Sequence, residues 1–233
     1  HHFQGMGEFV LAESKDSSFA VHTCQQPWRN ANDRMRVNRA VSIKSQYGRV
    51  SVQQSGVLKV DGVVSGDGTY NGIVISGSKR VVRFPSGEQV VMRRYGSGWW
   101  RHHTSVRVKL PKAAYTNNVQ GLCGAYTGDG RGAYMARGGA AVRRWGGWRD
   151  LSRFSSEFGE TWSVPAADSL FALDGITCGA AVTAVQKKAD AVSMWSDCPT
   201  MEAAAKANCP RGEAYDGCLI DVATTCEESW VTV

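Results

Sequence analysis

Gly-Leu-Cys-Gly-Ala-Tyr-Thr-Gly-Asp-Gly, at residues 121–130, divides a chain whose two parts differ in character. Four of these ten residues are glycines, which adopt positive φ angles at little cost. A disulfide bond at Cys123, between two of the glycines, would fix this permissive segment in one conformation. On spacing alone, an ordinary surface loop with an incidental buried thiol accounts for the stretch equally well. The neighbouring residues decide between these two interpretations.

The sequence before this stretch carries the pattern of β-strands. From Phe9 to about Leu110, short runs of alternating apolar and polar residues each end at Gly, Asn, Asp or Pro. The dipeptides Asp61-Gly62 and Asn71-Gly72 stand between runs, where hairpin turns need positive φ angles. No amphipathic stretch of helical length interrupts the series. The pattern predicts about eight or nine strands in a mainly β fold, an antiparallel β-sandwich or barrel.

The sequence after the stretch changes character twice. Residues 130–150 are rich in Gly, Arg and Trp without a clear period, and we expect a long loop there. Pro165 then closes the β domain. Beyond it the chain has two alanine-rich stretches, Met201–Ala207 and Ala180–Ala191, which favour helices. We therefore predict a β-sandwich domain at residues 1–165 and a small helical, disulfide-rich module at residues 166–233.

The seven cysteines are unevenly placed, and their placement indicates an oxidising, extracellular setting. Two lie far apart in the β domain, and five crowd into the last quarter of the chain, as in a small disulfide-bonded module. Five cysteines cannot all pair with one another, so at least one is expected to bond outside the tail. The tail has no histidine and no Cys-x-x-Cys pair, which argues against zinc. The candidate half-cystines are Cys24, Cys123, Cys178, Cys198, Cys209, Cys218 and Cys226.

The charged residues are distributed between the two parts of the chain as unevenly as the cysteines. Residues 1–165 contain 23 Lys and Arg against 11 Asp and Glu, whereas residues 166–233 contain 4 against 10. The basic body and the acidic tail could attract each other within one chain or between chains, and the body could meet acidic glycans. Two solvated surfaces of opposite sign account for the same division. No apolar run approaches the roughly 20 residues of a membrane helix, so this segment is not expected to insert into a membrane.

Several motifs resemble those of one known family. The sequence Phe-Gln-Gly-Met-Gly-Glu-Phe-Val-Leu at residues 3–11 is similar to an opening strand with the pattern F-x-G-x-C-x-Y-x-L, and Phe154, Phe158 and Trp162 resemble an F-x-x-S-W ending. The glycine-rich turn is similar to C-G-L-C-G-N-F. On these motifs the chain resembles a von Willebrand factor type D domain, and Cys209–Val222 resembles part of the eight-cysteine module that often follows it. The turn corresponds to Gly121, Leu122 and Gly124 around the central cysteine.

The departures from the family pattern concern its disulfides. Gly7 and Gln120 stand where the family usually has half-cystines, which indicates lost bonds in an intact fold. The family's initial segment, to which the cysteine of the turn usually bonds, is absent from this sequence. The resemblance therefore leaves Cys24 as the alternative partner of Cys123.

The resemblance implies a non-enzymatic extracellular module. Its partners would be other copies or other subunits of a secreted or cell-surface assembly, such as a filament, matrix or coat, and nucleic acid is not expected. The alternative is a glycan-binding module with a basic and aromatic surface, although a simple loop between strands explains the same residues. A salt-sensitive affinity for sulfated glycan would favour this alternative. The possible ligand surface comprises Arg93, Arg94, Trp99, Trp100 and Arg101.

The residues give no independent sign of catalysis or of a cofactor. Gly72–Lys79 superficially resembles a phosphate-binding loop, but it ends in Gly-Ser-Lys instead of Gly-Lys-Ser/Thr and no helical pattern follows. There is no G-x-S-x-G motif for a nucleophilic serine. We therefore expect no catalytic residues.

Calcium is possible but disfavoured. Family members that bind calcium use Asn and Asp side chains after the turn, together with an Asp of the initial strand. Here Ala125 and Thr127 stand at the first two positions, and Asp129, beside Arg131, is the remaining carboxylate. Because calcium takes six to eight oxygen ligands, several of them carboxylates, Asp129 would be a weak ligand and no tight site is expected.

Overall fold

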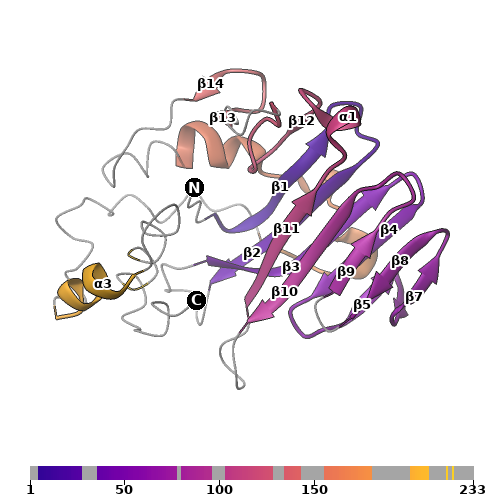
Figure 1. Cartoon of the computed structure of the whole chain (residues 1–233), viewed down its shortest axis with the longest axis horizontal. Helices are drawn as coiled ribbons and strands as arrows, with labels where there is room; N and C mark the ends of the chain where they lie inside the picture. Colours follow the sequence, from indigo (N-terminus) through magenta and orange to yellow (C-terminus); the bar gives the residue numbers. More distant parts are fainter. Residues whose placement is uncertain are drawn as a thin grey trace.

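The computed structural model of the chain is mainly β, with two antiparallel sheets that lie face to face (Figure 1). The prediction of an antiparallel β-sandwich is confirmed. The structure describes residues 5–27, 36–77, 80–95, 103–127, 134–142, 155–179 and 200–209, together with Leu219 and Val222.

The larger sheet has seven strands in the order β12-β1-β2-β3-β4-β5-β6. Strands β1 to β6 follow one another as antiparallel neighbours, and β12 returns to pair with the other side of β1. The predicted turn at Asp61-Gly62 joins β5 to β6, with φ angles of 49° and 84°. The strands are β1 (Gly7–Ser14), β2 (Ala20–Pro27), β3 (Arg36–Ser45), β4 (Gly48–Gln53), β5 (Leu58–Val60), β6 (Val63–Ser65) and β12 (Val119–Gln120).

The smaller sheet has five strands in the order β11-β10-β9-β8-β7. The predicted turn at Asn71-Gly72 joins β7 to β8, with φ angles of 48° and 82°. The strands are β7 (Gly68–Tyr70), β8 (Ile73–Ser76), β9 (Arg80–Arg83), β10 (Gln89–Tyr95) and β11 (His103–Lys109).

The main hydrophobic core fills the space between the two sheets. Alternate residues of both sheets meet there, such as Val41 of β3 and Ile75 of β8, which are 0% and 1% exposed. Phe19 packs edge-to-face on Phe84 and on Tyr115 of the short helix α1 (Lys112–Tyr115), with ring centroids 5.7 and 6.0 Å apart. This packing explains why the alternating pattern of the sequence predicts the sandwich.

The glycine-rich turn continues β12 along β1. Leu122 N donates to Val10 O at 3.0 Å, and Cys123 N donates to Leu11 O at 2.9 Å. The register of β1 against β2 shifts at this point, between Val10 and Ala12. Gly121 has a φ of 125°, and a Cβ added to it would lie 2.8 Å from Leu11 O. The close approach of two backbones therefore requires glycine at this position.

Residues 155–162 pack against the sandwich. Phe158 and Trp162 are 0% and 1% exposed, and they form a second core cluster with Phe9, Val10 and Leu122. A small hairpin of β13 (Tyr134–Met135) and β14 (Ala141–Val142) lies beside this cluster. A hydrogen bond of 3.1 Å from Trp162 Nε1 to Met135 O joins the hairpin to it. The helical elements of this return are η2 (Ser155–Gly159) and η3 (Glu160–Trp162).

In the C-terminal part, the structure describes the short 3-10 helices η4 (Ala166–Asp168) and η5 (Ala172–Asp174) and the α-helix α3 (Glu202–Asn208). Helix α3 covers most of the alanine-rich stretch that predicted a helix there. The second alanine-rich stretch, residues 180–191, lies outside the described residues.

Replacement of Gly121 by alanine is expected to destabilise the fold by about 1–3 kcal/mol, because the new Cβ meets the backbone of β1 at an unfavourable φ angle. Urea unfolding of Gly121→Ala would measure the loss. Gly66→Ala is the matched control, since nothing lies within 4 Å of its added Cβ. Equal stability of the two variants would show that the turn does not depend on the close approach to β1.

Candidate interaction site under a disulfide-bonded strap

Residues 163–179, called the strap from here on, cover the outer face of the seven-stranded sheet. Side chains alternate between the two faces of a strand, and Val41 of β3 points into the core between the sheets. Its neighbour Ser42 therefore points to the outer face, where Ser42 Oγ donates to Leu170 O at 3.3 Å. Ser42 is nevertheless fully buried. The strap thus shields a face of the sheet that a sandwich of two sheets would leave in solvent.

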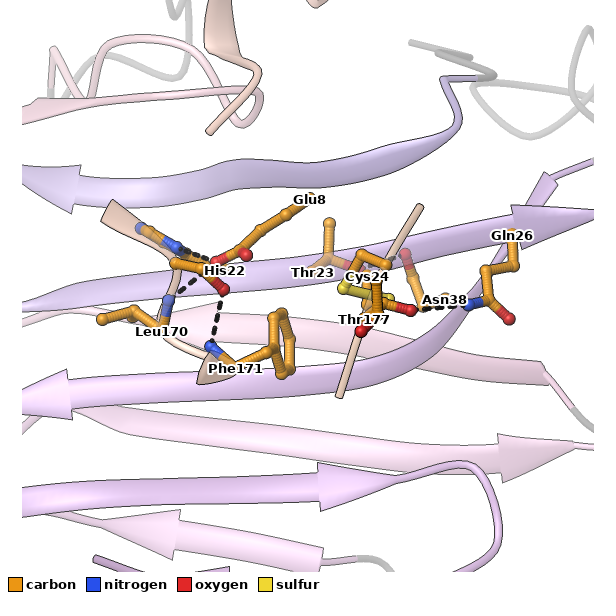
Figure 2. Close-up of a disulfide and its surroundings, with 11 residues drawn as sticks. Glu8, His22, Thr23, Cys24, Gln26, Asn38, Leu170, Phe171 and Thr177 are labelled. Atoms are coloured by element: carbon orange, nitrogen blue, oxygen red, sulfur yellow. Dashed lines mark hydrogen bonds and ion pairs between the residues drawn. A yellow bond between two sulfur atoms is a disulfide. The ribbon is translucent and has the colours of Figure 1, made fainter. Parts of the chain in front are cut away.

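The strap is fastened at both ends. Near its start, Val164 N donates to Glu8 O of β1 at 2.9 Å. Near its end, Cys178 forms a disulfide bond with Cys24 of β2, across a sequence separation of 154 residues (Figure 2). The boundary that the sequence placed at Pro165 therefore falls inside a segment that packs against the β domain.

The middle of the strap is bonded to four strands through its backbone. Leu170 N donates to Glu8 Oε1 at 2.9 Å, and Leu170 O accepts a bond of 3.0 Å from Arg49 Nη1 of β4. Asp174 O accepts a bond of 2.9 Å from Lys59 Nζ of β5. Together with the serine of β3, these side chains satisfy backbone groups that burial would otherwise leave unpaired.

An ion pair lies beneath the strap. Arg49 Nη2 is 3.4 Å from Asp174 Oδ1, and the two side chains are 11% and 0% exposed. Asp174 Oδ2 has no hydrogen-bond partner among the described residues. A buried carboxylate that lost its guanidinium partner would remain as an uncompensated charge, so the strap depends on this pair more than on an exposed one.

The disulfide corrects the sequence-based pairing of Cys24 with Cys123. Cys24 bonds to Cys178, with 5.3 Å between the two Cα atoms, and Cys123 is a free thiol. Cys24 of β2 lies opposite Glu8 of β1. The backbone N–H of Cys123, in contrast, donates a hydrogen bond to the carbonyl oxygen of Leu11, three residues further along β1. Three residues of strand span about 10 Å, which exceeds the reach of a disulfide bond. The expectation that one tail cysteine bonds outside the tail is met by Cys178.

Cys123 is exposed, but it stands in an open hollow of about 520 Å³. Burial of the thiol raises its pKa to about 11, although the residue as a whole is exposed. The thiol is therefore protonated at neutral pH and is a poor nucleophile. The other lining residues include Val108, Leu110, Val119 and Tyr126.

The other residues that the sequence predicted for a site are not brought together in the part of the chain that the structure describes. Arg93 is exposed on β10, and Arg94 belongs to the same strand. Cys209, at the end of α3, is buried and disulfide-bonded. The side chain of Arg94 lies outside the described part of the chain, as do Trp99, Trp100, Arg101, Asp129, Phe154, Cys198, Cys218 and Cys226.

The described residues contain no group of three or more His, Cys, Asp and Glu side chains that could hold a metal ion. Among the same residues, no helix is long and apolar enough to cross a membrane.

Sequence reasoning missed the residues that hold the strap. Glu8, His22, Arg49 and Lys59 occupy alternate strand positions, which predict contact with solvent. The odd number of cysteines in the tail was the one signal of a disulfide bond to the β domain. It did not identify which two cysteines form that bond.

The fold defines a β-sandwich module cross-linked to its own C-terminal segment. The von Willebrand factor type D domain model matches residues 1–140, and the chain belongs to this family. Such domains are typical of extracellular matrix proteins and secreted assembly proteins. The match covers both sheets and the glycine-rich turn, but it ends before the strap. No curated protein matches the chain.

Removal of the disulfide by the double replacement Cys24→Ser and Cys178→Ser is expected to lower stability by about 2–5 kcal/mol, because the bond closes a long loop. The strap should also become sensitive to limited proteolysis. Cys123→Ser is the control and should change stability little. Peptide mapping of the wild-type chain without reductant checks the assignment, and a Cys24–Cys123 peptide in place of Cys24–Cys178 would contradict it.

Loss of the buried guanidinium should cost more than loss of the whole ion pair. Arg49→Met is expected to destabilise the chain by about 3–5 kcal/mol, because it leaves Asp174 charged and unpaired. The double variant Arg49→Met, Asp174→Leu should recover part of this loss. Chemical unfolding of both variants measures the difference, and a double variant less stable than Arg49→Met would refute the argument.

Proposed function

We propose that this chain is a non-enzymatic structural module of an extracellular assembly, such as a filament, matrix or coat. Type D domains are generally adhesion and assembly modules, which supports the class of function. The observation that carries the proposal is the Cys24–Cys178 bond. A disulfide that joins the sandwich to its C-terminal segment suits an oxidising, extracellular compartment.

The proposed partners are other copies of the chain or other subunits of the same assembly. The uneven charge supports this, because a basic body can bind the acidic tail of its own chain or of a neighbour. Arg49 of the body and Asp174 of the strap already pair in this sense within one chain. We propose that residues 166–233, which include most of the strap, form the partial eight-cysteine module, and that acidic groups of this module serve for contact with body residues.

The module is proposed to act without a cofactor. Asp129 lies outside the described residues, so the case against a tight calcium site rests on the sequence of the loop. Assembly should then be the same with calcium and with a chelator.

The full chain is expected to self-associate under non-reducing conditions, and association should weaken as salt screens the opposite charges. Sedimentation velocity at low and high ionic strength, with calcium and with chelator, measures this. A strictly monomeric chain that binds sulfated glycan in a salt-sensitive manner would favour the glycan-binding alternative. Assembly that requires calcium and is lost in Asp129→Ala would overturn the cofactor-free proposal.

A further inference from the structure

A second hollow, of about 470 Å³, lies between the start of β1 and the strap. Its wall is formed mainly by the strap, and Glu8 contributes from β1. Glu8 is the one charged residue among the described residues that line it. The hollow is distinct from the one around Cys123, with which it shares no lining residue.

The carboxylate of Glu8 is buried but incompletely bonded. The residue is 7% exposed. Its Oε1 atom accepts hydrogen bonds from His22 Nδ1 at 2.7 Å and Leu170 N at 2.9 Å, as Figure 2 shows. No described residue donates to Oε2, although a carboxylate has about four acceptor positions. Oε2 is not among the buried atoms without a partner, so it keeps contact with solvent and is available to a ligand in the hollow.

The balance of the Glu8 charge depends on the ring of His22. The ring of His22 balances it only when both ring nitrogens are protonated, and with a neutral ring the pair carries one negative charge. The guanidinium of Arg49, which also reaches the strap, is engaged by Leu170 O and Asp174. An ionised carboxylate oxygen that lines the hollow attracts a positively charged ligand and gives a neutral one no such gain.

The other lining residues suit an ammonium group with an aliphatic stem. An ammonium group donates three hydrogen bonds, and hydroxyl groups of Ser163 and Ser169 lie on the same wall as further acceptors. Ser169 Oγ already accepts from Phe171 N at 3.1 Å and retains a second acceptor position. The apolar part of the wall, which includes Val164, Ala172 and Ile176, would cover methylene groups.

We propose that this hollow binds a primary ammonium group on an aliphatic stem, as in a small alkylamine or a lysine side chain. A calcium ion is a poor alternative, because one carboxylate supplies too few of its ligands. The described lining residues include no aromatic ring, which disfavours a quaternary ammonium group. The proposal does not depend on the assembly function.

The test is a titration of the full chain with n-butylammonium, followed through the backbone amide signal of Leu170, which is bonded to Glu8. A saturable shift is expected with n-butylammonium, whereas n-butanol, which has the same stem without the charge, should cause none. Glu8→Gln should weaken the affinity for n-butylammonium by about tenfold or more, because it removes a charged acceptor. Glu13→Gln, on the same strand but partly exposed and outside the hollow, should bind as the wild type does.

Three results would overturn the proposal: no saturable shift in the wild-type chain, an equal response to n-butanol, or undiminished affinity in Glu8→Gln. If Glu8→Gln does not fold, Ala172→Phe serves instead, because it fills the hollow and leaves the carboxylate in place. Undiminished binding to that variant would equally contradict the site. Titration with Nα-acetyl-lysine methylamide distinguishes a lysine side chain from a small alkylamine as the source of the ammonium group. Binding of this probe supports a lysine side chain as the ligand, and binding of n-butylammonium alone supports a small amine.

Discussion

The seven-stranded sheet is buried on both of its faces over β2, β3 and β4, and the rest of the structure depends on this. One face packs on the five-stranded sheet through β-branched and aromatic side chains. The other face carries Ser42 and Ser51, which are 0% and 1% exposed although no second sheet covers them. Because small polar side chains supply little hydrophobic free energy, the strap cannot be held by apolar packing alone. Hydrogen bonds to its backbone, one buried aromatic ring and a disulfide bond hold it in place.

The strap also explains why charged residues occur on a buried face. Arg49 and Lys59 reach carbonyl oxygens of the strap that have no partner within a regular helix or strand. Glu8 plays the complementary part by accepting from Leu170 N. An irregular segment can be buried only when its backbone groups are bonded, and side chains of the sheet provide those bonds here. The sheet and the strap therefore specify each other through polar contacts.

The sequence predicts local features of this fold well and distant contacts poorly. The alternation of β3 and β4 and the dipeptides Asp61-Gly62 and Asn71-Gly72 act over a few residues, and the strands and turns are found where they predict them. The pairing of Cys24 with Cys178 joins residues 154 positions apart, and no local pattern encodes it. Polar residues on a strand predict a solvated face, so the site around Glu8 could not be recognised before the strap was seen to cover it.

The bond between β2 and the strap has a mechanical consequence as well. It closes a covalent ring from Cys24 to Cys178 that contains β3 to β14. Tension applied to the chain from either side of this ring would pass through the two sulfur atoms, and the strands inside would carry none of it. Strand β1 lies outside the ring, and it pairs with β2 and β12. Under a pulling force, β1 would be peeled away first while most of the sandwich stayed folded, so the chain would lengthen by a limited step and then resist.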